Sequence, residues 1–180
     1  MLISRNQSCL LVVDVQARLA PAVHGERALI DNVRLLLQAA RRLDVPVLVS
    51  EQYPRGLGPT VDAVAEHVPD GAVMEKVHFS CLNDAAFAER FRQTGRNTAV
   101  VAGMEAHVCV LQTAEQLLQS GADVFVVADA TSSRTPANHA AALERMRHAG
   151  ARVVTSEMVV FEWLEKAGTP EFKELSALVK

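Results

Sequence analysis

Short apolar runs alternate along the chain with longer segments of helical periodicity. Six of these runs are bounded by polar or turn-forming residues, which predicts six buried β-strands. The runs cover residues 8–14, 45–50, 72–76, 98–103, 123–128 and 152–155. Strands that alternate with helices predict an α/β fold, in which helices cover both faces of a parallel sheet.

Apolar positions at spacings of three and four residues predict the helices. The clearest case runs from about Arg27 to Leu43. Another helix should begin after Asn83 or Asp84, either of which can cap it, and a further one should begin at Pro136 and end near Gly150. The remaining helices are expected up to about residue 66, from about residue 107, and as two short helices that close the chain. Residues 129–135 are expected to form a polar loop.

Composition narrows the class of protein. The 180 residues, 49% of them apolar, predict a single domain over residues 1–180. A net charge of −3 gives no electrostatic reason to expect binding to nucleic acid or to an acidic membrane. No apolar run is long enough to span a membrane, and the N-terminus has no signal-peptide pattern. The widely spaced Cys9, Cys81 and Cys109 favour a reducing, cytoplasmic location.

The stretch from Thr98 to Ala114 carries the strongest chemical signal. A buried strand breaks at Gly103, and helical spacing resumes near His107, so Cys109 is expected in the first turn of a helix. Free backbone N–H groups and the helix dipole in such a turn lower the pKa of a thiol. We therefore expect Cys109 to be a nucleophile.

Two further reactive side chains should reach the same edge of the sheet. Asp14 follows the first strand and Lys76 the third, and parallel strands present their carboxyl ends together. A carboxylate can accept the proton of a thiol, and a lysine beside the pair balances its charge. Each residue also has a plain structural alternative: a helix-capping acid, a solvated lysine, or a small core cysteine. Spacing alone leaves both interpretations open.

Three motifs together resemble the isochorismatase-like cysteine hydrolases. They are Asp14-Val-Gln16, Lys76 with Phe79-Ser80 beyond it, and the segment from Gly103 to Ala114. Residues 50–60, with Glu105–Cys109, resemble the isochorismatase domain-containing proteins. The resemblance implies a three-layer α/β/α fold with six parallel strands in the order 3-2-1-4-5-6. It also implies a Cys109-Asp14-Lys76 triad, a cis peptide at Met104–Glu105, and an oxyanion hole formed by the N–H groups of Glu105 and Cys109.

The sequence departs from parts of this superfamily in two ways. Metal-containing nicotinamidases carry an Asp-x-His pair after strand two, where this chain has Ser50-Glu51-Gln52. The six histidines show no metal-ligand spacing, and most are expected at the surface or in loops: His24, His67, His78, His107, His139 and His148. We therefore expect no metal and no other cofactor. Isochorismatases proper generally lack the cysteine, so its presence here favours acyl chemistry.

The predicted function is hydrolysis of a C–N bond in a small amide-like substrate through a thioester. The alternatives are hydrolysis of another ester- or ether-like bond, and a binding or scaffold protein that retains the fold. The candidate pocket residues are Gln16, Tyr53, Phe79 and His107, and for each of them a structural role has at least equal weight.

The remaining expectations concern assembly and one turn-rich loop. The resemblance implies a homo-oligomer, a dimer or a tetramer. Val159, Phe161 and Trp163 could contribute to an interface, although a core role is favoured. Arg55-Gly56-Leu57-Gly58 lacks the pattern of a dinucleotide-binding loop and is expected to be a turn-rich segment, which could cover the pocket.

Overall fold

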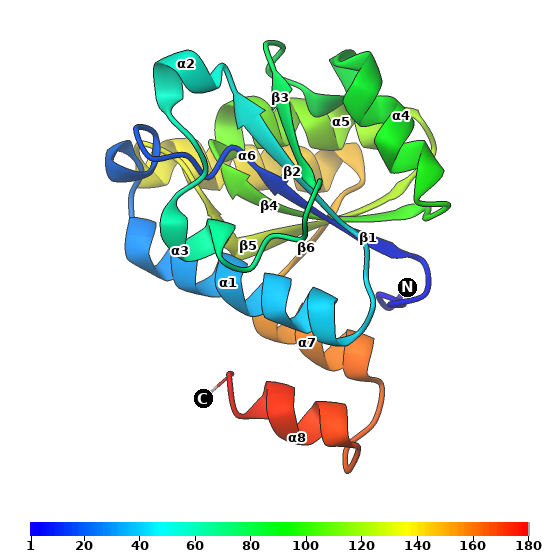
Figure 1. The fold of residues 1–180 in the computed structure, drawn as a ribbon. Helices are drawn as coiled ribbons and strands as arrows, with labels where there is room; N and C mark the ends of the chain where they lie inside the picture. The colour runs from blue at the N-terminus through cyan, green and yellow to red at the C-terminus, as the bar shows by residue number, and fades with distance from the viewer. Residues whose placement is uncertain (180) are drawn as a thin grey trace.

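A six-stranded parallel sheet forms the centre of the computed structural model, which describes residues 1–179 (Figure 1). The strands lie in the order β3-β2-β1-β4-β5-β6, as the family resemblance implies. Their bounds are β1 Ser8–Val13, β2 Val47–Gln52, β3 Val73–Lys76, β4 Thr98–Met104, β5 Asp123–Ser132 and β6 Arg152–Val154. The predicted α/β class and all six strands are confirmed.

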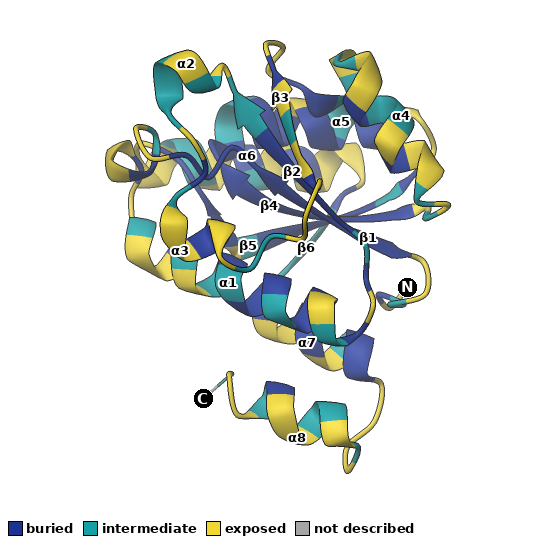
Figure 2. Ribbon diagram, viewed as in Figure 1, coloured by how far each residue is buried: buried dark blue, intermediate teal, exposed yellow. Residues whose placement is uncertain are grey.

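Side chains of the central strands alternate between two apolar cores because helices cover both faces of the sheet. In β1, Leu10 and Val12 belong to one core, whereas Leu11 and Val13 belong to the other. Every residue of β1 and β4 is buried, as the dark colour of these strands shows (Figure 2). This burial explains why their sequences are continuous apolar runs.

The helices divide between the two faces of the sheet. Helices α1, α3 and α7 lie on one face of the sheet and α4, α5 and α6 on the other (Figure 1). The side chains of each group join the core on their own face. Two short helices, η1 and α2, lie in the loops near the carboxyl ends of β1 and β2, and α8 packs beyond α7. The helices span, in chain order, η1 Ala20–Ala22, α1 Glu26–Arg42, α2 Pro54–Leu57, α3 Asp62–Ala65, η2 Cys81–Asn83, α4 Ala85–Gln93, η3 Ala106–Val110, α5 Leu111–Gln119, α6 Pro136–Ala149, α7 Ser156–Leu164 and α8 Pro170–Ser176.

The expectation of a polar loop over residues 129–135 is wrong for its first half, because β5 continues to Ser132. The β4–β5 pairing shifts register after Val101 and then resumes with Gly103 opposite Thr131 and Met104 opposite Ser132. Polar side chains can stay in this strand because they find partners: the Asp129 carboxylate accepts hydrogen bonds from both the N–H and the hydroxyl of Ser156, each at 2.7 Å. The sequence pattern misses such long-range partners.

The C-terminal apolar residues belong mainly to the core. Val159 and Trp163 are fully buried, and the indole N–H of Trp163 donates to the Ser8 hydroxyl at 3.1 Å. Phe161 is partly exposed and packs edge-to-face against Phe172, with 6.3 Å between ring centroids. The favoured core assignment is thus confirmed for two of the three residues.

Gly103 is required where β4 passes β1 at its carboxyl end. Its φ is +121°, and an added Cβ would lie 2.0 Å from the carbonyl oxygen of Val13. We expect Gly103→Ala to lower the free energy of unfolding by about 3 kcal/mol or more, since both the backbone and the neighbouring strand must shift. Chemical denaturation measures this change.

Gly121→Ala is the matched control for this substitution. Gly121 has a φ of +87°, but its added Cβ would meet nothing within 4 Å. The free energy of unfolding of the control should therefore fall by only about 1–2 kcal/mol, because only the strain of a positive φ applies to it. Equal losses for the two variants would contradict the steric explanation.

Candidate active site

Asp14 lies at the centre of a buried polar cluster. It follows β1 with a φ of +53° and donates its backbone N–H to the carbonyl of Ser50 at 3.1 Å. Its carboxylate accepts hydrogen bonds from Lys76 Nζ at 2.8 Å and from Ser50 Oγ at 2.6 Å. The Cys109 thiol is also close enough to this carboxylate for each group to shift the pKa of the other. The carboxyl ends of the parallel strands β3, β1 and β4 thus bring the three predicted residues together.

Lys76 ends β3, and four oxygen atoms surround its ammonium group. Besides Asp14, the acceptors are Gln52 Oε1 at 2.6 Å and the carbonyls of His78 and Phe79 at 3.2 and 3.1 Å. The side chain is 1% exposed. Burial lowers the pKa of Lys76, but the charge of Asp14, the nearby Cys81 and Cys109, and the hydrogen bond to Asp14 together outweigh burial, so the net shift is upward. An ammonium group with three protons and four acceptors is held charged and in place.

Cys109 lies in η3, a π-helical turn that leads into α5. Burial, and then the negative charge of Asp14, raise the pKa of the Cys109 thiol above its ordinary value. The expectation of a lowered pKa is therefore wrong in direction. The helix terminus does not prevail because Cys109 is only 5% exposed and its thiol lies near a carboxylate. At rest the sulfur carries its proton, and Asp14 lies where it can accept it.

The other two thiols are more deeply buried. Cys9 and Cys81 have no exposed surface. Burial raises the pKa of Cys9 to about 12 and that of Cys81 to about 11. Of the three cysteines, Cys109 alone has some exposed surface, and its thiol lies near the Asp14 carboxylate.

The turn between β4 and η3 presents a free backbone donor. The peptide bond Met104–Glu105 is cis, at the position that the family resemblance implies. The carbonyl of Glu105 accepts from the N–H groups of Val108 and Val110, whereas no protein acceptor within residues 1–179 pairs with the Glu105 N–H. An unpaired N–H group four residues before Cys109 can hydrogen-bond to a negatively charged oxygen atom.

The four candidate pocket residues occupy different settings. The Gln16 amide is fully buried and bonds to the backbone of Gln52 and to the Gly58 carbonyl, which favours its structural alternative. Tyr53 and Phe79 are more than half exposed, near the ends of β2 and β3. Tyr53 also lines a cavity of about 290 Å³ together with Lys76 and Val77. His107 is half-buried and hydrogen-bonds through Nδ1 to Ser133 Oγ at 2.9 Å.

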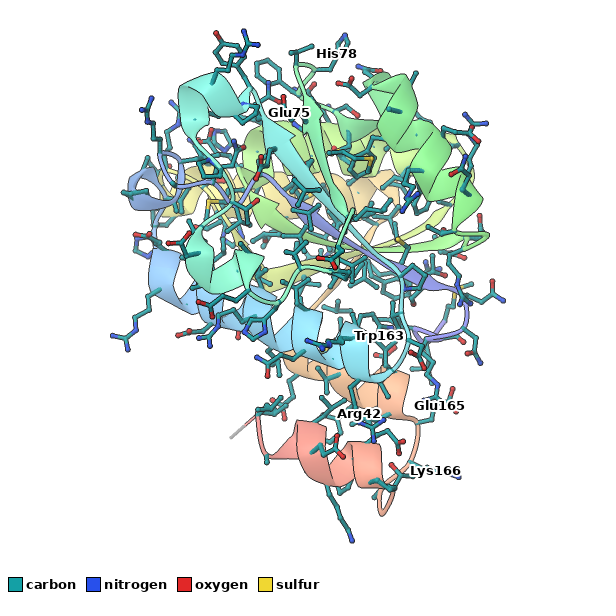
Figure 3. All side chains as sticks on the ribbon, viewed as in Figure 1. Arg42, Glu75, His78, Trp163, Glu165 and Lys166 are labelled. Atoms are coloured by element: carbon teal, nitrogen blue, oxygen red, sulfur yellow. The ribbon has the colours of Figure 1, made fainter. Side chains whose placement is uncertain are left out.

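The histidines are spread over the molecule. His78 lies beyond β3 at the opposite end of the protein from Arg42 and α8 (Figure 3). Burial lowers the pKa of His139 below its ordinary value, and the nearby His24 lowers it further. In the described part of the chain, no three His, Cys, Asp or Glu side chains are grouped as metal ligands would be.

Sequence reasoning missed three polar residues of this site. Ser50 and Gln52 hold Asp14 and Lys76, and Arg134 pairs with the Glu105 carboxylate at 2.7 and 3.1 Å. A signal existed for the first two, since Ser50-Glu51-Gln52 is a polar run at the same sheet edge as Asp14. No signal marked Arg134, because its contact depends on the unexpected length of β5.

Comparison with known proteins agrees with the fold and with the family resemblance. The family model for the isochorismatase domain matches residues 8–158. Isochorismatase domain-containing protein 1 of Salmo salar is 40% identical over 93% of this chain, which spans 59% of that relative. A solved structure described as the MAR1 ribonuclease of Caenorhabditis elegans superposes with a TM-score of 0.93 at 35% identity, covering 99% of this chain and 92% of that one.

A second solved structure has the same fold at lower identity. The YcaC gene product of Escherichia coli, described as an octameric hydrolase of unknown specificity, has a TM-score of 0.93 at 25% identity, over 99% of this chain and 90% of that one. The family match covers most of the chain and contains every residue of the buried cluster. The chain therefore belongs to the isochorismatase family and has the fold of its hydrolases.

Proposed function

We propose that this protein is a cysteine hydrolase that cleaves a C–N bond of a small amide-like substrate. The observation that carries the proposal is the buried cluster in which one carboxylate, Asp14, pairs with the Lys76 ammonium and lies close to the Cys109 thiol. A thiol, a base and a fixed cation in contact are the parts that nucleophilic acyl transfer needs. No redox step and no metal is part of the scheme.

The reaction begins when a substrate carbonyl reaches Cys109. The thiol proton passes to Asp14 as the sulfur attacks the carbonyl carbon. The oxygen becomes negatively charged and is held by the N–H groups of Glu105 and Cys109. Lys76 stabilises the negative charge of the cluster throughout.

The tetrahedral intermediate then collapses with cleavage of the C–N bond. Asp14 returns its proton to the departing nitrogen, which leaves as ammonia or an amine. A water molecule, deprotonated by Asp14, attacks the remaining thioester and releases the carboxylic acid together with the thiol. The raised pKa of Cys109 fits this cycle because the thiol is the resting form and an expelled thiolate readily regains a proton.

Two other activities have weaker support. The worm structure is described as that of a ribonuclease. The present chain carries a net charge of −3, which opposes binding to a polyanion, and its cluster offers an acyl nucleophile. Hydrolysis of an ester- or ether-like bond remains the enzymatic alternative, and a binding or scaffold role is the alternative outside catalysis.

The direct test is to trap the acyl-enzyme. The protein is incubated with a panel of small amides and esters, quenched in acid, and digested for mass spectrometry. We expect the mass of the acyl group on the peptide that contains Cys109, and none on those with Cys9 or Cys81. Turnover of ester- or ether-like substrates, with no amide accepted, would favour the enzymatic alternative. Absence of any adduct and of any turnover across the panel would contradict the proposal.

The reactivity of the thiols provides a test that needs no substrate. Iodoacetamide should modify Cys109 of the native protein faster than Cys9 or Cys81, because Asp14 can accept its proton and the other thiols are fully buried. Because the pKa of Cys109 is raised above the ordinary 9.0, its thiolate fraction keeps increasing as the pH rises through that value. We therefore expect the rate to rise from pH 7 to pH 10 without levelling near neutrality.

Asp14→Asn separates the two effects of this carboxylate on alkylation. Loss of the base should slow modification of Cys109 at pH 7. If the main effect of Asp14 were to raise the pKa of the thiol, the variant would react faster. A faster reaction, or equal rates for the three wild-type thiols, would contradict the proposed role of Asp14.

We also propose that the chain forms a homo-oligomer in the cytoplasm. The octameric assembly named for the Escherichia coli relative supports self-association. Large apolar side chains exposed at two places, Tyr53, Val77 and Phe79 near the site and Leu2, Met158 and Phe161 near α7, offer surfaces for it. Light scattering would measure the assembly, and a monomer would contradict it.

No helix within residues 1–179 has the length and apolar character needed to cross a membrane.

A further inference from the structure

The segment after β5 is attached to the turn that precedes Cys109. The β4–β5 ladder ends with Met104 opposite Ser132. Beyond that point, Ser133 Oγ hydrogen-bonds to His107 Nδ1 at 2.9 Å, and Arg134 pairs with Glu105 through two hydrogen bonds. Two side-chain contacts therefore continue the alignment of the two strands over the turn.

Glu105 presents an electrostatic problem at this turn. Its side chain is 8% exposed, and its carboxylate belongs to the residue whose N–H is the proposed oxyanion donor. A buried negative charge there opposes development of a second negative charge on the substrate. Arg134 Nε and Nη2 are the only donors within hydrogen-bond distance of this carboxylate among residues 1–179, and His107 Nε2 lies 4.0 Å away.

The two side chains of this ion pair differ in how far they are exposed and in how they are held. The Arg134 side chain is 63% exposed, whereas that of Glu105 is almost fully covered. Arg134 reaches Glu105 from a segment fixed at three points: the Ser133 carbonyl accepts from the His24 N–H at 2.9 Å, the Ser133 hydroxyl contacts His107, and Thr135 caps α6. The segment that carries Arg134 is therefore held by its own contacts, and the guanidinium places a positive charge beside the buried Glu105 carboxylate.

We propose that Arg134 is a positioning residue for the oxyanion turn: through its bidentate pair with Glu105 it orients the Glu105 peptide and cancels the carboxylate charge beside the developing oxyanion. This inference rests on the proposed acyl-transfer function. Arg134 itself contacts neither the thiol nor the reacting carbonyl in this scheme. Its effect should appear only in reactions that generate an oxyanion.

Two reagents that act on the same sulfur separate this role from a general structural one. With p-nitrophenyl acetate, the sulfur attacks the carbonyl, an oxyanion forms, p-nitrophenolate leaves, and an acetyl thioester remains on Cys109. With iodoacetamide, a sulfur–carbon bond forms as iodide leaves, and no oxyanion arises. Both reactions release the thiol proton to Asp14 or to solvent, so they share every requirement except stabilisation of the oxyanion.

The experiment measures both rates for the wild type and for Arg134→Ala, with mass spectrometry to confirm Cys109 as the modified residue. We expect acetylation to fall by about 10- to 100-fold, the effect of a misplaced or weakened oxyanion donor, and alkylation to stay unchanged. Arg134→Lys should recover part of the acetylation rate. Arg92→Ala is the matched control, since Arg92 is similarly exposed and pairs with Glu89 at 2.7 Å within α4.

A double-mutant cycle tests whether Arg134 acts through Glu105. In a Glu105→Gln background there is no carboxylate charge to cancel, so Arg134→Ala should reduce acetylation far less than in the wild type. Equal effects in both backgrounds would overturn the proposal. Unchanged acetylation in Arg134→Ala would also overturn it, as would an equal fall in acetylation and alkylation.

The wild-type result separates the two levels of inference. A wild-type Cys109 that is alkylated but never acetylated would overturn the proposed acyl-transfer function, and with it the role of Arg134. Acetylation of the wild type with no selective loss in Arg134→Ala would overturn only the role of Arg134. Circular dichroism and thermal unfolding confirm that each variant is folded before its rates are compared.

Discussion

Cys109→Ala is expected to reduce amide hydrolysis by about 10⁴-fold or more and to abolish the acyl adduct. The sulfur is the atom that forms the covalent intermediate, and neither Asp14 nor the oxyanion turn can replace it. The residual rate would come from binding and from the oxyanion donors acting on a water molecule. The measurement is kcat/KM on whichever amide of the panel the wild type hydrolyses.

Cys9→Ala is the matched control for this prediction. Cys9 is a fully buried thiol of β1 that hydrogen-bonds only weakly, to the Leu10 carbonyl at 3.9 Å. Its replacement should leave turnover unchanged at a modest expense in stability, since it removes one small apolar group. Wild-type turnover in folded Cys109→Ala would contradict the covalent mechanism. Equal losses in both variants would show that stability, and not the nucleophile, was affected.

Lys76→Met is expected to lower the free energy of unfolding by about 3–5 kcal/mol and to remove activity. The substitution preserves most of the side-chain volume, but it leaves Asp14 as a buried carboxylate without its cation. The Lys76 and Asp14 side chains are 1% and 0% exposed, so water cannot replace the lost partner. Denaturant unfolding measures the stability change.

The stability loss should depend on pH with a definite sign. Burial already raises the pKa of Asp14 above the ordinary 3.8, and Lys76 opposes that shift. Without Lys76 the folded-state pKa rises further, so the folded variant binds a proton that the unfolded chain releases above pH 3.8. The free energy of unfolding of Lys76→Met should therefore fall as the pH rises from about 4 through the folded-state pKa.

Two further variants complete this prediction. Lys166→Met changes an exposed lysine at the α7–α8 turn (Figure 3) and should leave stability nearly unchanged. The double substitution Asp14→Asn with Lys76→Met removes both charges and should be more stable than Lys76→Met alone. A double variant no more stable than the single one would contradict the electrostatic explanation. So would a loss that does not depend on pH.

The sequence was sufficient to predict the architecture because its local signals agree with each other. Continuous apolar runs such as Ser8–Val13 predict strands buried on both faces, and helical spacing between them predicts crossover helices. The order of the strands came from the family resemblance, and the sheet has that order. Apolar periodicity failed in β5, whose last residues are polar and depend on partners such as Ser156.

In the candidate site, too, local sequence predicted some features and long-range contacts decided others. Strand ends alone suggested Asp14, Lys76 and Cys109, because parallel strands present their carboxyl ends at one edge. The direction of the pKa shift of Cys109 could not be predicted locally, since it depends on burial and on a carboxylate 95 positions earlier in the chain. Ser50 and Gln52 likewise gain their roles only through the residues they contact across the sheet.

By itself, then, the sequence determined which segments form strands and helices and which residue types reach the active edge. Those properties depend on the periodic pattern of neighbouring residues. The tertiary structure decided which polar groups meet, how deeply each is buried, and therefore which one carries a proton. Arg134 shows the difference most clearly: nothing around it in the chain marks it, and its contact with Glu105 arises because β5 continues four residues beyond its apolar run.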